Sequence, residues 1–228
     1  GVQTCSSDLD RQSALNAFRQ AFALHQRGML AEAERLYLDV LTVLPNMSDA
    51  LHFLGTLKAQ RGDYEGAVGL IGRAILINPG DASAHYNLAN ALRDLNRLNK
   101  AIDAYDKALK LTPAHVGALI NRGQLYERLQ KYDKALESYD RALAANPENA
   151  NVHYNKANVL RELGRLEDAL SAYTQAIALA PGNVGALNNR GNLLMRLRRN
   201  REALRDYDAA LAVAPDNSGT HCNRGNVL

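Results

Sequence analysis

Tryptophan is absent from this 228-residue chain, cysteine occurs twice, and proline occurs only six times. No run of 18 apolar residues exists, which excludes a membrane-spanning helix. Cys5 and Cys222 lie at opposite ends, so no paired-cysteine metal or redox motif is present. The net charge is only +3 and comes from dispersed arginines, so neither nucleic acid nor an anionic membrane is indicated as a partner. With 46% hydrophobic residues the chain is too apolar to be disordered.

The six prolines reveal an internal repeat. They recur at one constant interval, at Pro45, Pro79, Pro113, Pro147, Pro181 and Pro215. With each proline placed at position 32 of its unit, the chain contains six units: 14–47, 48–81, 82–115, 116–149, 150–183 and 184–217. Residues 218–228 match the opening of a seventh unit, and residues 1–13 lie outside the pattern.

Other positions of the repeat are restricted in size. Position 8 is always alanine or glycine, position 20 is always alanine, and position 27 is alanine in five of the six units. Position 24 is tyrosine in every unit but one, as in Tyr105, Tyr139 and Tyr173. Small residues are what two helices need where they approach most closely, and the larger side chain fills the wider space beside them. Each unit therefore predicts a pair of antiparallel helices.

The ends of these helices are also encoded. Proline at position 32 cannot continue the second helix and disfavours helical geometry in the residue before it. Residues of the type that cap helix N-termini then precede the next first helix, at Asp81, Asn149, Asn183 and Asn217. Each unit is thus expected to stop and restart at the same place.

This combination of period and small, aromatic and proline positions resembles the tetratricopeptide repeat, a helix–turn–helix unit of about 34 residues, over residues 14–228. The resemblance implies an all-α fold, a right-handed superhelical solenoid of antiparallel helix pairs, and a role as a protein-interaction scaffold. Two positions depart from the family pattern. Position 4 carries His85, His153 and His221, and position 7 carries Arg122, Lys156, Arg190 and Arg224.

The two ends of the chain give further expectations. Residues 1–13 are predicted to be a leader that is disordered or artefactual. Residues 218–228 form the first helix of a truncated seventh repeat, with an apolar face that lacks its second helix. We therefore expect a fragment of a longer repeat protein, with self-association through this C-terminal helix as one consequence.

No catalytic constellation, phosphate-binding loop or calcium loop is found, so neither an enzymatic activity nor a cofactor is predicted for the chain itself. The three histidines at position 4 occur in every second unit, on alternate first helices about 20 Å from each other. Zinc requires its ligands at about 2 Å, so these histidines are interpreted as packing residues.

The remaining functional signal lies on the first helices, which line the concave groove in the family. Positions 6 and 9 there carry a double row of side-chain amides: Asn87, Asn90, Asn121, Gln124, Asn155, Asn158, Asn189, Asn192, Asn223 and Asn226. An amide offers two donors and an acceptor, so such a row can pair with the backbone of an extended polypeptide. Tyr86, Ile120 and Tyr154 flank it at position 5. The alternative is that these asparagines only pack or hydrogen-bond between helices.

The expected partner is a protein or peptide in extended conformation, and a cytoplasmic location is expected. The lysines with which chaperone-tail-binding members hold a terminal carboxylate are missing, so such a clamp is disfavoured. Asp94, Glu127 and Glu162 in the groove argue against RNA. The amide row and the first unit also resemble the repeat arm of O-linked N-acetylglucosamine transferases. That resemblance implies an alternative function, the substrate-recognition arm of a glycosyltransferase whose catalytic domain is not in this chain.

Overall fold

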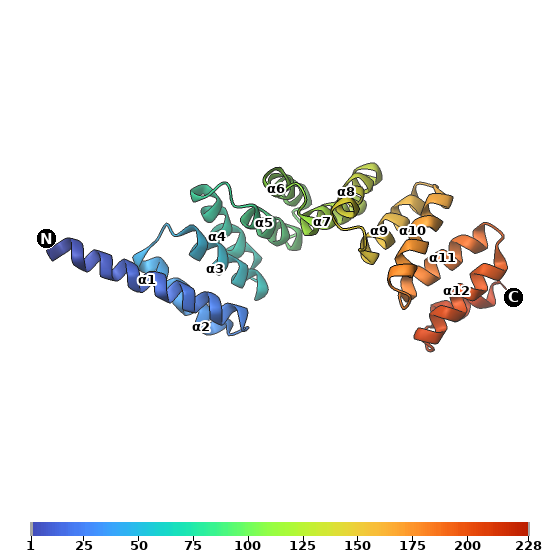
Figure 1. Cartoon of the computed structure of the whole chain (residues 1–228), viewed down its shortest axis with the longest axis horizontal. Helices are drawn as coiled ribbons and strands as arrows, with labels where there is room; N and C mark the ends of the chain where they lie inside the picture. The colour runs from blue at the N-terminus through green and yellow to red at the C-terminus, as the bar shows by residue number, and fades with distance from the viewer. Residues whose placement is uncertain (1, 228) are drawn as a thin grey trace. The chain divides into compact units, whose positions relative to one another are not determined.

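The computed structural model describes residues 2–227, and the side chains of residues 10–227. This part of the chain forms thirteen α-helices and no strand, which confirms the predicted all-α solenoid (Figure 1). The helices are α1 (Val2–Gln26), α2 (Leu30–Val43), α3 (Ser48–Gln60), α4 (Tyr64–Ile77), α5 (Ala82–Asp94), α6 (Leu98–Leu111), α7 (Val116–Arg128), α8 (Tyr132–Ala145), α9 (Ala150–Glu162), α10 (Leu166–Leu179), α11 (Val184–Arg196), α12 (Asn200–Val213) and α13 (Ser218–Gly225).

The helices repeat with the period of the prolines. From α3 to α11, every first helix has 13 residues and starts at position 1 of its unit, and every second helix from α2 onward has 14. The first helix α1 is longer, with 25 residues, because it begins at Val2. Residues 2–13, for which the sequence predicts a disordered or artefactual leader, are therefore part of a continuous helix. The side chains of the first nine residues lie outside the described part.

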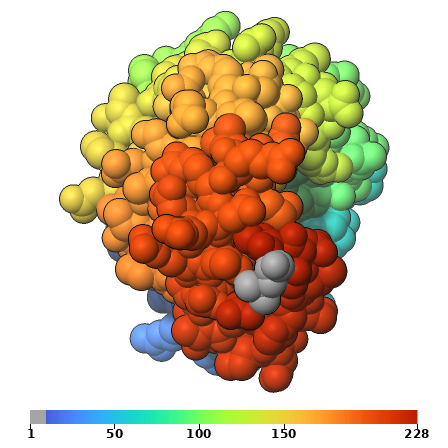
Figure 2. Space-filling model, turned by 90° about the vertical axis from the view of Figure 1, so that its right-hand side faces the viewer, coloured from blue at the N-terminus to red at the C-terminus, as the bar shows by residue number. Residues whose placement is uncertain are grey.

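The chain divides into two compact units, residues 1–113 and 114–228. In the first unit the pairs α1–α2, α3–α4 and α5–α6 stack in order, and α2 and α4 also contact the first helix of the following pair. The second unit repeats this arrangement with α7–α8, α9–α10 and α11–α12, and α13 packs on α12. Figure 2 shows the second unit from its C-terminal side, with α11–α13 in orange to red.

Between the paired helices the core consists of alanines and tyrosines. The alanines at position 20 and the tyrosines at position 24 are fully buried, with 0% of their surface exposed. Glycine at position 8 leaves room for a ring: a Cβ built on Gly123 would lie 2.6 Å from Cε1 of Tyr139, and one built on Gly191 would lie 2.7 Å from Cε1 of Tyr207. The small residues therefore set the close approach of the two helices, as the sequence predicts.

Helix ends follow from the residues found there. Asp81, Asn149, Asn183 and Asn217 all accept hydrogen bonds from backbone N–H groups of the helix they precede, which confirms the predicted N-caps. Position 15, between the two helices of a unit, adopts a positive φ in all six units. Glycine occupies it in three of them, and Asn96, Gln130 and Arg198 occupy it in the others at φ of 57°, 55° and 61°.

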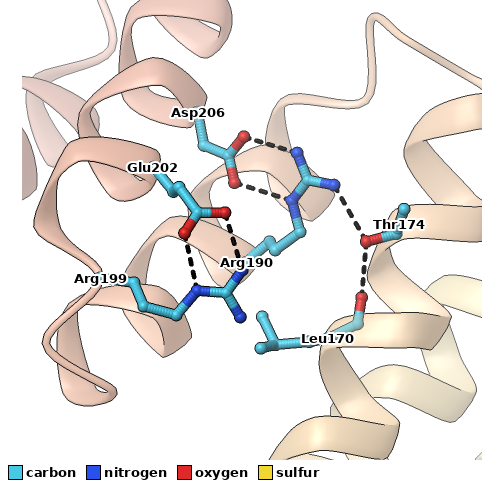
Figure 3. Close-up of polar contacts among 6 residues, drawn as sticks. All are labelled: Leu170, Thr174, Arg190, Arg199, Glu202 and Asp206. Atoms are coloured by element: carbon cyan, nitrogen blue, oxygen red, sulfur yellow. Dashed lines mark hydrogen bonds and ion pairs between the residues drawn. The ribbon is translucent and has the colours of Figure 1, made fainter.

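The basic residues at position 7 form polar contacts between helices, and Arg190 links three of them. Arg190 on α11 forms a bidentate pair with Asp206 on α12 at 2.8 and 2.6 Å, and its Nη1 donates to the Thr174 hydroxyl on α10 at 3.1 Å (Figure 3). Lys156 and Arg224 instead form an ion pair with the preceding second helix, through Asp140 and Asp208, each at 2.6 Å. Position 7, which departs from the family pattern, thus carries charged contacts between neighbouring helices.

The histidines at position 4 share one contact. Nε2 of His85, His153 and His221 lies 3.1, 2.9 and 2.7 Å from the carbonyl oxygen of Pro79, Pro147 and Pro215 respectively. Because a carbonyl only accepts, Nε2 carries the hydrogen in each case. No group of three potential metal-ligating side chains occurs among the described residues, and the role of these histidines here is to tie the turn to the first helix.

Candidate functional site

The candidate site is the face of the first helices that carries the amide side chains at positions 6 and 9. In the second unit these are Asn121, Gln124, Asn155, Asn158, Asn189, Asn192, Asn223 and Asn226, on α7, α9, α11 and α13 or directly after it. None of them is buried. In the first unit Asn87 and Asn90 hold the same positions on α5 and are also partly exposed.

Asn158 and Asn189 show how these amides are held. Oδ1 of Asn158 accepts the Tyr173 hydroxyl at 2.6 Å and Nδ2 of Asn189 at 3.0 Å. Nδ2 of Asn189 also donates to the Tyr154 hydroxyl at 3.2 Å. Both hydrogens of the Asn189 amide and both lone pairs of the Asn158 oxygen are therefore used between helices. Among the described residues, Nδ2 of Asn158 and Oδ1 of Asn189 have no partner.

Parts of this arrangement recur in other repeats. The hydroxyls of Tyr207 and Tyr105 donate to Oδ1 of Asn192 and Asn90 at 2.7 and 2.6 Å. In the first unit, Nδ2 of Asn87 donates to Nε2 of His52 at 2.9 Å and contacts the Thr56 hydroxyl at 3.4 Å. A buried tyrosine thus fixes the amide at position 9, and the amide at position 6 reaches back to positions 5 and 9 of the preceding first helix.

The asparagine row can be interpreted either as a ligand-binding surface or as a set of contacts between helices, and the same side chains fit both interpretations. Asn189 makes the inter-helix contacts of the structural alternative, yet its oxygen remains unpaired. A paired donor and acceptor is consequently supplied by two amides: the Asn158 amino group from one helix and the Asn189 oxygen from the next. From the sequence, both functions are expected of each single amide.

The flanking residues at position 5 are half-buried. The ring centroids of Tyr154 and Tyr173 are 6.2 Å apart, and those of Tyr86 and Tyr105 are 5.9 Å apart. Ile120 is half-buried as well. Tyr86 and Tyr154 thus lie next to the buried tyrosine of their own repeat, and all three residues keep part of their surface exposed.

The fourth repeat departs from this pattern. Position 9 is Gln124, and the buried Tyr139 hydroxyl donates instead to Oε2 of Glu127, one helical turn further on, at 3.0 Å. Gln124, Asn155, Glu127, Glu162, Arg128, Gln130 and Tyr132 line an open hollow of about 640 Å³ here. Burial raises the pKa of Glu127, and the nearby Glu162 carboxylate raises it further, against the lowering effects of the Tyr139 hydrogen bond and of the Arg161 charge.

Burial also acts on the tyrosines of the core. It raises the pKa of Tyr37 and of Tyr173 to about 12 in each case, and it raises the pKa of Tyr139 and Tyr207 as well. His52 shows the opposite effect for a base: burial lowers its pKa, and the neighbouring Asp81 at 3.1 Å partly offsets this. These tyrosine hydroxyls remain protonated at neutral pH, and those of Tyr173 and Tyr207 donate to the amides at position 9.

Comparison with family models decides the family. Models of the tetratricopeptide repeat match residues 54–116, 120–184, 184–217 and 17–38. The chain belongs to the tetratricopeptide repeat family. No curated protein matches it in sequence.

Solved tetratricopeptide repeat proteins share the fold. A repeat protein from Parabacteroides merdae is 21% identical, with 95% of this chain and 86% of that chain covered and a TM-score of 0.74. YrrB, described as having an unusual peptide-binding site, is 20% identical over 83% of this chain and 97% of its own, with a TM-score of 0.73. MamA from Desulfovibrio magneticus is 21% identical over 75% and 97%, with a TM-score of 0.70.

The tyrosine contacts of the groove were not predicted from the sequence. Tyrosine at position 24 and asparagine at position 9 recur together in three of the six repeats. That co-occurrence is a readable signal for a hydrogen bond between the two helices of a tetratricopeptide repeat.

No helix among the described residues is long and apolar enough to cross a bilayer.

Proposed function

We propose that this tetratricopeptide repeat protein is an interaction scaffold that binds an extended polypeptide segment of a partner along the first helices. The observation that carries the proposal is the pre-oriented pair of Asn158 and Asn189. Their inter-helix bonds at 3.0 and 2.6 Å hold one free amino group and one free carbonyl oxygen in place. A peptide backbone offers the complementary acceptor and donor.

The geometry supports recognition that tolerates different sequences. First helices of successive repeats stack about 10 Å apart, and an extended chain advances about 3.3 Å per residue. One amide pair would therefore meet about every third residue of the ligand. The rigidity of the pair also favours binding, since little side-chain freedom is lost when the ligand arrives.

The family and one of its solved members support this proposal. The family supplies interaction modules, and YrrB is described as a peptide-binding member. The alternative, an arm of an O-linked N-acetylglucosamine transferase, would use the same groove for its protein substrates. Self-association through α13 remains a separate proposal.

The test uses substitutions that keep the side-chain oxygen of each asparagine, which accepts the tyrosine hydroxyl, and remove only its amino group. In the double variant Asn158→Asp, Asn192→Asp, the carboxylates still accept from Tyr173 and Tyr207, but the free amino groups are lost. The matched control is Asn146→Asp, Asn200→Asp, which changes the net charge equally at two exposed positions.

Binding is measured by calorimetry with a nine-residue peptide of alternating glycine and serine that carries a central lysine. We expect about tenfold weaker binding for the groove variant and no change for the control, because each lost hydrogen bond contributes about 0.5–1.5 kcal/mol. Circular dichroism checks that helicity is equal. Equal affinity of groove variant and control would show that the ligand does not use these amides.

A further inference from the structure

The hollow of the fourth repeat differs from the rest of the groove in its charge. Glu127 is half-buried beside it, and the fully buried Tyr139 holds one of its oxygens at 3.0 Å. In the third, fifth and sixth repeats the hydroxyl of the corresponding tyrosine donates instead to Oδ1 of an asparagine at position 9. The fourth repeat thus fixes a carboxylate where these three repeats fix an amide.

Glu127 has no ion pair among the described residues. The nearby Arg161 is engaged by Glu162 at 2.8 Å. Arg128 also lines the hollow, but its side chain already has an interaction of its own. The second acidic residue of the lining, Glu162, is close enough for its charge to act on Glu127. Arg161 still acts on Glu127 through its charge, but a half-buried carboxylate without a direct ion pair costs free energy that a bound cation would recover.

The rim of the hollow fits a peptide side chain. Gln124 on α7 and Asn155 on α9 line it together, and neither has a hydrogen-bond partner among the described residues. Their amides can pair with the backbone on either side of one ligand residue while its side chain enters the hollow. The volume of about 640 Å³ is ample for the longest natural side chains.

We infer that this hollow is a specificity subsite that takes a lysine or arginine side chain of the bound peptide, with Glu127 as its counter-charge. The inference rests on the proposed function, because the ligand backbone must lie along the first helices for its side chain to reach Glu127. It adds a selective position to a groove that is otherwise tolerant of sequence. Tyr139 acts as a positioning residue, since its hydroxyl orients the carboxylate.

The direction of the Glu127 pKa agrees with such a subsite. Burial and Glu162 raise this pKa in the absence of a ligand. A cationic side chain beside Glu127 stabilises the charged form and should lower the pKa again. Binding of a basic peptide is therefore expected to release a proton from Glu127 when the pH lies near the raised value.

The experiment compares three nine-residue peptides of alternating glycine and serine, with lysine, norleucine or glutamate at the centre. Norleucine keeps the length of the lysine stem and removes its charge. The protein variants are Glu127→Gln, which still accepts the Tyr139 hydroxyl, and the matched control Glu148→Gln, which removes the same charge at an exposed turn. Affinities are measured by calorimetry at low ionic strength.

We expect the parent to bind the lysine peptide about tenfold more tightly than the norleucine peptide and to bind the glutamate peptide most weakly. Glu127→Gln should abolish the preference for lysine and leave binding of the norleucine peptide unchanged, whereas Glu148→Gln should keep the preference. Equal binding of lysine and norleucine peptides to the parent, or a lysine preference retained in Glu127→Gln, would overturn the subsite and leave the backbone groove standing. If no peptide binds the parent, both the proposed function and the subsite are wrong.

Discussion

The side-chain amide of Asn189 donates to Oδ1 of Asn158 at 3.0 Å and so joins α11 to α9 across the repeat boundary. The same oxygen accepts the hydroxyl of the buried Tyr173 at 2.6 Å. One hydrogen-bonded node therefore connects the core of the fifth repeat with the exposed face of the sixth. In the proposed function, stability and ligand recognition depend on the same amides, and the two contributions can be separated by mutation.

Asn189→Ala should destabilise the protein. It removes two hydrogen bonds between helices and leaves the Tyr154 hydroxyl and the Asn158 oxygen with one partner fewer. We expect a loss of about 1–3 kcal/mol in the free energy of unfolding, measured by urea denaturation. Asn155→Ala is the matched control at the same repeat position, because Asn155 makes no hydrogen bond to other described residues. Equal destabilisation by both substitutions would show that the node contributes nothing.

Gly123→Ala tests the close approach of α7 and α8. Its new methyl group would lie 2.6 Å from Cε1 of Tyr139, so the fully buried ring would have to shift. We expect a cost of about 1–3 kcal/mol, read from a thermal melt. Gly69→Ala on α4 meets no atom within 4 Å and should instead stabilise its helix by up to about 1 kcal/mol. A melting temperature that is unchanged by Gly123→Ala would contradict the packing described here.

Arg198→Gly should stabilise the turn between α11 and α12. Arg198 adopts a φ of 61°, whereas Gly164 occupies the equivalent position of the preceding repeat at 73°. A left-handed conformation costs a non-glycine residue about 1 kcal/mol, so the substitution should recover up to that amount. Chemical denaturation of both proteins provides the comparison, and a less stable variant would refute the expectation.

Glu127 should make stability depend on pH in a defined direction. Its folded pKa lies above the ordinary value of 4.5, so its charged form is disfavoured in the folded state. The stabilising contribution of its protonation is complete below pH 4.5 and is lost as the pH rises through the raised pKa. Glu127→Gln should accordingly be more stable than the parent at pH 7, and the difference should shrink toward pH 4.5. Denaturation curves at several pH values, with Glu148→Gln as the control, test this; a difference that grows on acidification would contradict it.

Much of the fold could be predicted because the residues that determine each helix end and each close contact recur from repeat to repeat. Each of three residue types acts locally: proline at position 32 ends a helix, alanine at position 20 allows two helices to approach, and Asn149 caps the next helix. The contacts of His153 and Lys156 could not be predicted, since their partners Pro147 and Asp140 become neighbours only once the helices have stacked.

The sequence predicts which residues lie at the candidate site, but not which end of each amide remains free to bind a ligand. The periodicity places Asn158 and Asn189 on the same face, but which end of each amide stays free depends on Tyr173 and Tyr154. Those contacts cross between helices and leave only a weak trace in the sequence. The hollow beside Glu127 was not predicted for the same reason, because it arises where Gln124 replaces the usual asparagine and Tyr139 turns to another acceptor.

A comparison of three peptides tests whether the amide pairs recognise the backbone of the ligand. Calorimetry on the parent protein would compare the alternating glycine–serine peptide with central lysine, an alternating alanine–glutamine peptide with the same lysine, and the first peptide with its backbone nitrogens methylated. Methylation removes the donors that pair with oxygens such as Oδ1 of Asn189. We expect similar affinity for the first two peptides and at least tenfold weaker binding after methylation. Equal binding of the methylated peptide, with loss of binding for the changed sequence, would contradict it.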